Sequence, residues 1–263
     1  MIRCSSDHQD TNQLLEAIDL IRQPSACPEI FDAPIWNLQF TQKDWKNWKA
    51  HWQLDGLQHA TVTPQTDSLT LSAGPEADNS QSVVLWTRES FAGDIKIEYD
   101  YTRLDHSDRY VNILYLHATG KGEPPYVDDI SAWSALRSKP FMNLYYENMN
   151  LIHISYAVMR TSEPDYIRVR CYPVTPGKDF QEDTAVPGTY YNQGMFETGQ
   201  TYHITTIKRG MALLFRVTGA GLDRVYQWDL SAFPNLTGGR IGLRQMQTRM
   251  ARYANFKVFT KPV

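Results

Sequence analysis

The chain has 263 residues, which is enough to bury a large core and allows one or two domains. Its net charge is −3 with acidic and basic residues interspersed, so we expect no nucleic-acid partner, because nucleic-acid binding needs a concentrated basic surface. No run of 18 apolar residues is present, and the sequence therefore predicts no membrane partner.

Residues 1–34 are predicted to form a helix and a linker ahead of the main domain. Apolar side chains recur at helical spacing over 8–22, with Thr11 before them as an N-cap. The segment 24–34 contains three prolines, which are typical of a linker. The start lacks the apolar core of a signal peptide, so we expect a cytoplasmic protein. Three cysteines without paired spacing predict reduced thiols, no metal site and no cofactor.

From residue 35 to 263 the pattern changes to short segments of alternating apolar and polar residues, separated by Gly, Pro, Asp and Asn. There is no alternation of strands with helices, so the sequence predicts an all-β domain built as a sandwich of antiparallel sheets. The segments 121–143 and 174–200 are too long for hairpins, and we expect them to fold over one face and shape a site. Strands are predicted at 68–74, 81–88, 93–104, 109–120, 150–160, 165–174, 201–210, 211–219, 238–246 and 253–261.

The segment DYIRVRCYP (165–173) places charged and aromatic side chains on one face of a strand. Tyr166, Arg168, Arg170 and Tyr172 share this face by the two-residue period. Two guanidinium groups cannot pack in an apolar core without partners. They fit an outer or concave face, where arginine binds a carboxylate such as that of a uronic acid through two parallel hydrogen bonds. The alternative is a solvated face with surface ion pairs.

The segment NLIHISYAV (150–158) is apolar but contains a histidine. Alternation places His153, Ser155 and Ala157 on one face and Tyr156 on the other, with Ile152 and Ile154. A bulge would be needed to bring His153 and Tyr156 to the same side. A histidine among apolar neighbours is more often a hydrogen-bonded core residue than a catalyst, and both possibilities stay open.

Several stretches resemble a known superfamily. WKNWKAHWQLDG (45–56), SLTLSAG (68–74) and VVLWTRESFAGDIKIEYDY (83–101) resemble the opening of concanavalin A-like jelly rolls, and GGRIGLRQMQTRMARYANFKVF (238–259) resembles their terminal strand pair. NMNLIHISYAV and DYIRVRCYPV narrow the resemblance to a small bacterial jelly-roll family, long of unknown function, found in rhamnogalacturonan- and ulvan-degrading gene clusters. The resemblance covers residues 36–261 and implies a concanavalin A-like jelly-roll sandwich.

This resemblance also implies a substrate class, because one relative is an oligosaccharide dehydratase that removes water from a terminal uronic acid. We therefore expect a lyase acting by β-elimination on uronate-containing oligosaccharides. In this hypothesis His153 is the base, a tyrosine is the acid and arginine holds the carboxylate. The predicted catalytic residues are His153, Tyr156 and Tyr146. The predicted substrate-binding residues are Arg168, Arg170, Tyr166, Tyr145, Asn148, His117 and Arg244.

Three other functions remain as alternatives. A non-catalytic carbohydrate-binding jelly roll would need exposed aromatic side chains and few titratable groups, whereas the clustering of His, Tyr and Arg at 145–172 favours an enzyme. A sugar isomerase would use the same groups. A retaining glycoside hydrolase is disfavoured because Glu98 and Asp100 share a face but Thr102 stands where the second catalytic carboxylate would be needed.

Overall fold

The computed structural model describes residues 31, 33, 35–158 and 164–261. The helix predicted at 8–22 lies outside the described residues. The chain forms two compact units, Met1–Trp36 and Asn37–Val263, and the second contains all the strands of the described part. None of the helices in the described ranges is long and apolar enough to cross a membrane.

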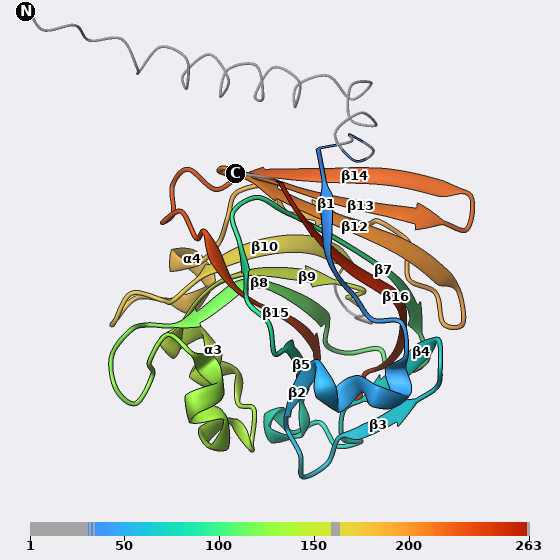
Figure 1. Cartoon of the computed structure of the whole chain (residues 1–263), viewed down its shortest axis with the longest axis horizontal. Helices are drawn as coiled ribbons and strands as arrows, with labels where there is room; N and C mark the ends of the chain where they lie inside the picture. The colour runs from blue at the N-terminus through green and yellow to red at the C-terminus, as the bar shows by residue number, and fades with distance from the viewer. Residues whose placement is uncertain (1–30, 32, 34, 159–163, 262–263) are drawn as a thin grey trace, which may run out of the picture. The chain divides into compact units, whose positions relative to one another are not determined.

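The unit Asn37–Val263 is a sandwich of two antiparallel sheets with eight strands each in the described residues (Figure 1). Sheet A has the order β14-β13-β12-β7-β16-β4-β3, with β1 paired to β16. Sheet B has the order β11-β10-β9-β8-β15-β5-β2, with β6 paired to β15. Sheet A comprises β1 (Asn37–Thr41), β3 (Thr61–Pro64), β4 (Ser68–Ser72), β7 (Ile95–Arg103), β12 (Thr201–Arg209), β13 (Ala212–Gly219), β14 (Leu222–Asp229) and β16 (Met250–Thr260). Sheet B comprises β2 (Trp52–Asp55), β5 (Val83–Thr87), β6 (Phe91–Ala92), β8 (Asn112–Gly120), β9 (Met149–Tyr156), β10 (Tyr166–Tyr172), β11 (Tyr190–Tyr191) and β15 (Gly238–Gln245).

The predicted all-β jelly-roll sandwich is confirmed, and each predicted strand corresponds to a strand of the structure. The expected β12–β13 hairpin closes where Arg209 pairs with Ala212. The sequence did not indicate β14, whose eight residues LDRVYQWD follow directly on β13, or the short strands β1, β2, β3, β6 and β11. Strands of two to five residues carry too few alternations for a periodic signal.

The main core lies between the two sheets, and β7 shows how the sequence builds it. Ile95, Ile97, Tyr99 and Tyr101 are fully buried in this core, as the alternation predicted. The hydroxyl of Tyr99 donates to that of Tyr156 at 3.1 Å, so buried phenols satisfy one another. Lys96, Glu98 and Asp100 lie on the outer face of sheet A, where Lys96 pairs with Glu98 and Asp100 with His203.

A second core covers the outer face of sheet B. It joins Trp86 of β5 and Tyr115 of β8 to side chains of the long segment 121–148, including Trp133 and Tyr145. This segment contains η3 (Ile130–Arg137) and α3 (Met142–Asn148), and α4 (Phe180–Asp183) lies on the same side of the sheet (Figure 1). The expectation that this excursion folds over one face is therefore correct. The remaining short helices are η1 (Trp45–Ala50) and η2 (Asn79–Gln81).

Candidate functional site

The outer face of sheet B gathers most of the residues predicted to form the site. Strand pairing places Arg168 opposite Ser155 and Arg170 opposite His153, and His153 lies opposite Tyr115 on its other side. Residues opposite each other on one face of a sheet have neighbouring side chains. The two motifs that the sequence singled out separately therefore form one surface.

His153 is the central member of a buried hydrogen-bonded chain. Its Nδ1 lies 2.5 Å from the hydroxyl of Tyr172, and its Nε2 lies 2.7 Å from Oγ of Ser155. The phenol has no other partner among the described residues, so we assign it as the donor to Nδ1. Nε2 then carries the hydrogen and donates to Ser155. In this arrangement the imidazole cannot accept the serine proton, which argues against a serine nucleophile.

The surroundings of His153 keep it neutral. Only 3% of the residue is exposed, and this burial holds the pKa of His153 well below its usual value of 6.5. The positive charges of Arg170, Arg168 and Arg244 lower the pKa further. The sequence left open whether His153 is a catalyst or a hydrogen-bonded core residue. Its burial and its two hydrogen bonds are those of a core residue.

Tyr156 does not join His153, because the β8–β9 register is regular from Asn112↔Tyr156 to Leu116↔Ile152. No bulge interrupts this stretch, and Tyr156 is fully buried in the core between the sheets. The hypothesis that Tyr156 is the acid partner of His153 is therefore wrong on geometry. Ala157 also departs from the predicted face, since its φ of 49° turns the chain and places it in the same core.

Arg170 has a structural role and is not free to bind a substrate carboxylate. It is 2% exposed, and its Nη1 donates to the carbonyls of Phe180 at 3.2 Å and Gln181 at 3.0 Å, and to Oγ1 of Thr184 at 3.0 Å. These acceptors belong to α4 and its C-cap, so the guanidinium fastens this helical turn to sheet B. The prediction that Arg170 binds substrate is contradicted, because these donors are already used.

Arg168 keeps unused hydrogen-bonding capacity. Its guanidinium carbon lies 4.2 Å from the centroid of the Tyr166 ring, and Nη2 donates to the Tyr166 hydroxyl at 2.7 Å. Its Nε is buried and has no hydrogen-bond partner among the residues that the structure describes. Tyr191 of β11 packs edge-on to Tyr166 and is 54% exposed. At this end of sheet B, the buried ring of Tyr166 thus contacts both the guanidinium of Arg168 and the solvent-exposed ring of Tyr191.

Arg244 of β15 and Tyr145 of α3 are buried between sheet B and the segment that covers it. Arg244 donates to the carbonyl of Pro140 at 2.8 Å and lies under the Tyr145 ring at 4.7 Å. The Tyr145 hydroxyl donates to Asp55 at 3.1 Å. Both side chains are fully buried and hold the covering segment in place. The prediction that they bind substrate is therefore contradicted, because a ligand cannot reach them.

Of the last three predicted residues, Tyr146 packs edge-on against Tyr172, the partner of His153, whereas Asn148 and His117 lie elsewhere. Tyr146 is half-buried and stacks on Phe180 with ring centroids 4.3 Å apart, and Asn148 donates to the carbonyl of Leu144 in the last turn of α3. His117 is buried away from this face. Its Nδ1 bonds to the carbonyl of Leu236 at 2.8 Å, and burial lowers its pKa to about 4. Neither Asn148 nor His117 is placed to contact a ligand with His153.

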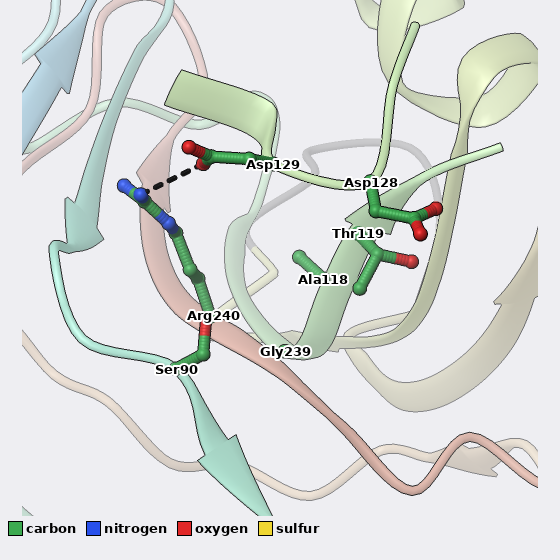
Figure 2. Close-up of a pocket in the computed structure, with 7 residues that line it drawn as sticks. All are labelled: Ser90, Ala118, Thr119, Asp128, Asp129, Gly239 and Arg240. Atoms are coloured by element: carbon green, nitrogen blue, oxygen red, sulfur yellow. Dashed lines mark hydrogen bonds and ion pairs between the residues drawn. The ribbon is translucent and has the colours of Figure 1, made fainter. Parts of the chain in front are cut away.

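Sequence reasoning missed a pocket with three charged side chains in its lining, at the opposite end of sheet B, shown in Figure 2. Its volume is about 380 Å³, and it lies between the end of β8, the start of β15 and the residues before η3. The one sequence signal was the pattern Asp129-Ile130-Ser131, which is typical of a helix N-cap and was overlooked. The lining residues are Ser90, Ala118, Thr119, Asp128, Asp129, Gly239 and Arg240.

With this geometry described, comparison with known proteins assigns the family. The family model described as a domain of unknown function (DUF1961) matches residues 40–258. The chain belongs to this family. The expected membership of a jelly-roll family of unknown function is thereby confirmed. Among curated proteins, no sequence matches this chain significantly.

Several solved structures share the fold. A Bacillus subtilis protein of unknown function with a galectin-like fold is 20% identical, with a TM-score of 0.60 over 86% of this chain and 100% of that one. The exoplasmic domain of VIP36, bound to Ca²⁺ and Man3GlcNAc, is 10% identical with a TM-score of 0.56 over 86% and 92% of the two chains. Winged bean acidic lectin in complex with methyl-α-D-galactose is 9% identical, with a TM-score of 0.56 over 86% and 99%. At these identities the likeness concerns the fold alone.

Proposed function

We propose that this protein binds carbohydrate, and specifically oligosaccharides that carry a carboxylate, at the Arg168 end of sheet B. The observation that carries the proposal is the half-buried guanidinium of Arg168, which stacks on Tyr166 and donates to its hydroxyl through Nη2, while the exposed ring of Tyr191 packs on the same Tyr166. A stacked arginine is fixed in direction, and its fork of N–H donors matches the two oxygens of a carboxylate.

The neighbouring aromatic side chain supports a sugar ligand over a free carboxylate. Tyrosine offers an apolar ring face for the C–H side of a pyranose and a hydroxyl for its polar side. The sandwich also resembles structures of sugar-bound lectins, although the sugars in those structures are ligands of those proteins. Fold likeness alone would not assign a function, so the proposal depends on Arg168.

The test is isothermal titration calorimetry with uronate-containing oligosaccharides from rhamnogalacturonan and ulvan, and with carboxyl-reduced versions of the same sugars. We expect binding of the acidic forms that Arg168→Ala weakens by about 10- to 100-fold, because hydrogen bonds to charged groups contribute ~1.5–3 kcal/mol. Arg209→Ala, at an exposed position of the β12–β13 turn, is the matched control. Equal affinity for acidic and reduced sugars would contradict the assignment of Arg168.

β-Elimination on the same sugars is a second candidate, favoured by one observation. His153 is neutral, as a general base must be, and its partner Ser155 lies directly opposite Arg168. Because Nδ1 accepts from Tyr172 and Nε2 carries the hydrogen, the ring can take a proton only when the Tyr172 hydroxyl turns away from Nδ1. In this reaction the base removes the proton next to the carboxylate, a carbon–carbon double bond forms, and hydroxide or a sugar oxygen departs with a proton.

An ultraviolet assay separates the two candidates, because the unsaturated uronate absorbs and the bound substrate does not. An absorbance increase that is lost in a folded His153→Gln variant would establish elimination. Binding without any absorbance increase would leave the protein a carbohydrate-binding jelly roll and His153 a structural residue. Tyr172→Phe keeps the ring but removes the hydrogen bond to Nδ1, which leaves this nitrogen free to accept a proton, so elimination with His153 as the base should not slow and binding should persist.

A further inference from the structure

The pocket of Figure 2 combines hydrogen-bond donors and acceptors on two facing walls. Arg240 and Asp129 form one wall, with Arg240 Nη2 2.9 Å from Asp129 Oδ1. Asp128 and Thr119 lie on the other wall. The pocket therefore presents carboxylate acceptors, guanidinium donors and a hydroxyl toward one small volume of about 380 Å³.

The Asp129–Arg240 wall is fixed before any ligand arrives. Asp129 is the N-cap of η3 and accepts from the backbone N–H of Ser131 at 3.0 Å and from its hydroxyl at 2.7 Å and 2.8 Å. In the described part of the chain, Arg240 Nη1 makes two long hydrogen bonds of 3.5 Å each, to Gln53 Oε1 and to the carbonyl of Thr87. This nitrogen can therefore turn to a ligand with little loss of protein contacts.

Backbone forms the floor of the pocket, because no side chain fits at Gly239. Its φ is 147°, and a Cβ there would lie 2.4 Å from the carbonyl carbon of His117. The β8–β15 register shifts next to this contact, between Arg240 and Gly242. The glycine therefore lets the backbones of β8 and β15 touch at the edge of the pocket.

Charge restricts the ligand class. Asp128 is exposed and has no side-chain partner in the described ranges, so the lining carries the carboxylates of Asp128 and Asp129 and the guanidinium of Arg240, while the positive charge of Arg88 acts on Arg240 from outside the lining. These opposite charges nearly balance, so the pocket attracts an anionic ligand only weakly. A divalent cation prefers six to eight oxygen ligands and would be repelled by the guanidinium at 2.9 Å from Asp129. An uncharged hydroxyl group both donates and accepts, and it can use both walls.

We propose that this pocket is a second sugar subsite, which binds an uncharged pyranose through a pair of neighbouring hydroxyl groups. The inference rests on the proposed carbohydrate binding and adds a neutral sugar to its ligand. One hydroxyl bridges Asp128 and Thr119, and the next bridges Asp129 and Arg240. Strand geometry places this pocket about 20 Å from Arg168, three strands away and four residues along β15, so no single sugar ring contacts both sites.

The experiment is amide chemical-shift mapping of the full chain with methyl glycosides of mannose, galactose, glucose and rhamnose. These four sugars present neighbouring hydroxyls in different relative orientations. Each is added to about 20 mM, which would fill even a site with a Kd of ~1 mM. We expect at least one sugar to give saturable shifts at the amides of Thr119 and Gly239. Asp128→Asn, an isosteric change at an exposed position, should weaken this binding about tenfold or more.

Two variants serve as controls. Asp67→Asn makes the same chemical change in the exposed β3–β4 turn and should bind as the wild type does. Arg168→Ala should leave the shifts at Thr119 and Gly239 unchanged while it weakens uronate binding. No saturable shift with any of the four sugars would overturn the subsite, even when uronates bind at Arg168. The same shifts from CaCl2 alone, with no sugar effective, would also overturn it. Failure of uronates and neutral sugars together would defeat the proposed function itself.

Discussion

The buried carboxylate of Asp55 is predicted to hold the covering segment onto sheet B. Its Oδ2 accepts from Trp86 Nε1 at 2.7 Å, from Arg137 Nε at 2.6 Å and from the Tyr145 hydroxyl at 3.1 Å. Neither charged side chain of the Asp55–Arg137 pair has any exposed surface. Asp55→Ala leaves the guanidinium of Arg137 buried without its counter-charge, which costs about 3–5 kcal/mol.

The assay is urea unfolding of the wild type and the variant, followed by tryptophan fluorescence. In a parallel thermal unfolding experiment, a loss of this size lowers Tm by roughly 6–20 °C in a domain of this length. Asp223→Ala, which breaks the more exposed pair with Arg216, is the control and should cost at most about 1 kcal/mol. Arg137→Met in the Asp55→Ala background should recover part of the loss, because it removes the uncompensated charge. If Asp55→Ala costs no more than Asp223→Ala, the reasoning about the buried pair is refuted.

The remaining predictions concern packing and pH. Gly242→Ala should lower the free energy of unfolding in urea by about 1–3 kcal/mol, because the added Cβ would lie 2.5 Å from the Trp86 ring, which stacks on Tyr115. The control is Gly238→Ala, whose Cβ would have its nearest neighbour at 3.4 Å and which should lower the free energy of unfolding far less. The folded-state pKa of His117 is about 4 against 6.5 when unfolded, so the unfolded chain binds more protons and stability should fall as pH drops from 6.5 toward 4. His117 contributes up to ~1.4 kcal/mol per pH unit to this slope, beside the contribution of His153, whose pKa is also lowered. The slope should therefore be smaller in His117→Gln when unfolding is measured at several pH values, and an unchanged slope would contradict the assignment.

Much of the fold could be predicted from the sequence because strand alternation is a local property. Ile95 to Tyr101 alternate with charged residues, and this pattern alone places them in the core. The same period correctly grouped Tyr166 with Arg168 and separated His153 from Tyr156. Where the backbone leaves regular strand geometry, as at Ala157 and His117 with φ near 50°, alternation fails.

The candidate site was less predictable, because a residue type does not specify its partner. Arg168 and Arg170 are two residues apart on one strand face, yet Arg170 is consumed by the carbonyls of α4 while Arg168 keeps an unpartnered Nε. The difference depends on where a segment ten residues further along the chain folds back. No pattern within the strand contains that information.

The sequence by itself determined the β-sandwich and the faces of its strands, since hydrophobic burial acts through a period that neighbouring residues define. Only the tertiary structure decided which polar residues remain open. The segment 121–148 covers Arg244 and buries its own Tyr145 against sheet B, and the approach of β8, β15 and the residues before η3 creates the pocket of Figure 2. Burial and access depend on contacts between residues more than 100 positions apart, such as Asp129 with Arg240, and such contacts form only when the sheets assemble.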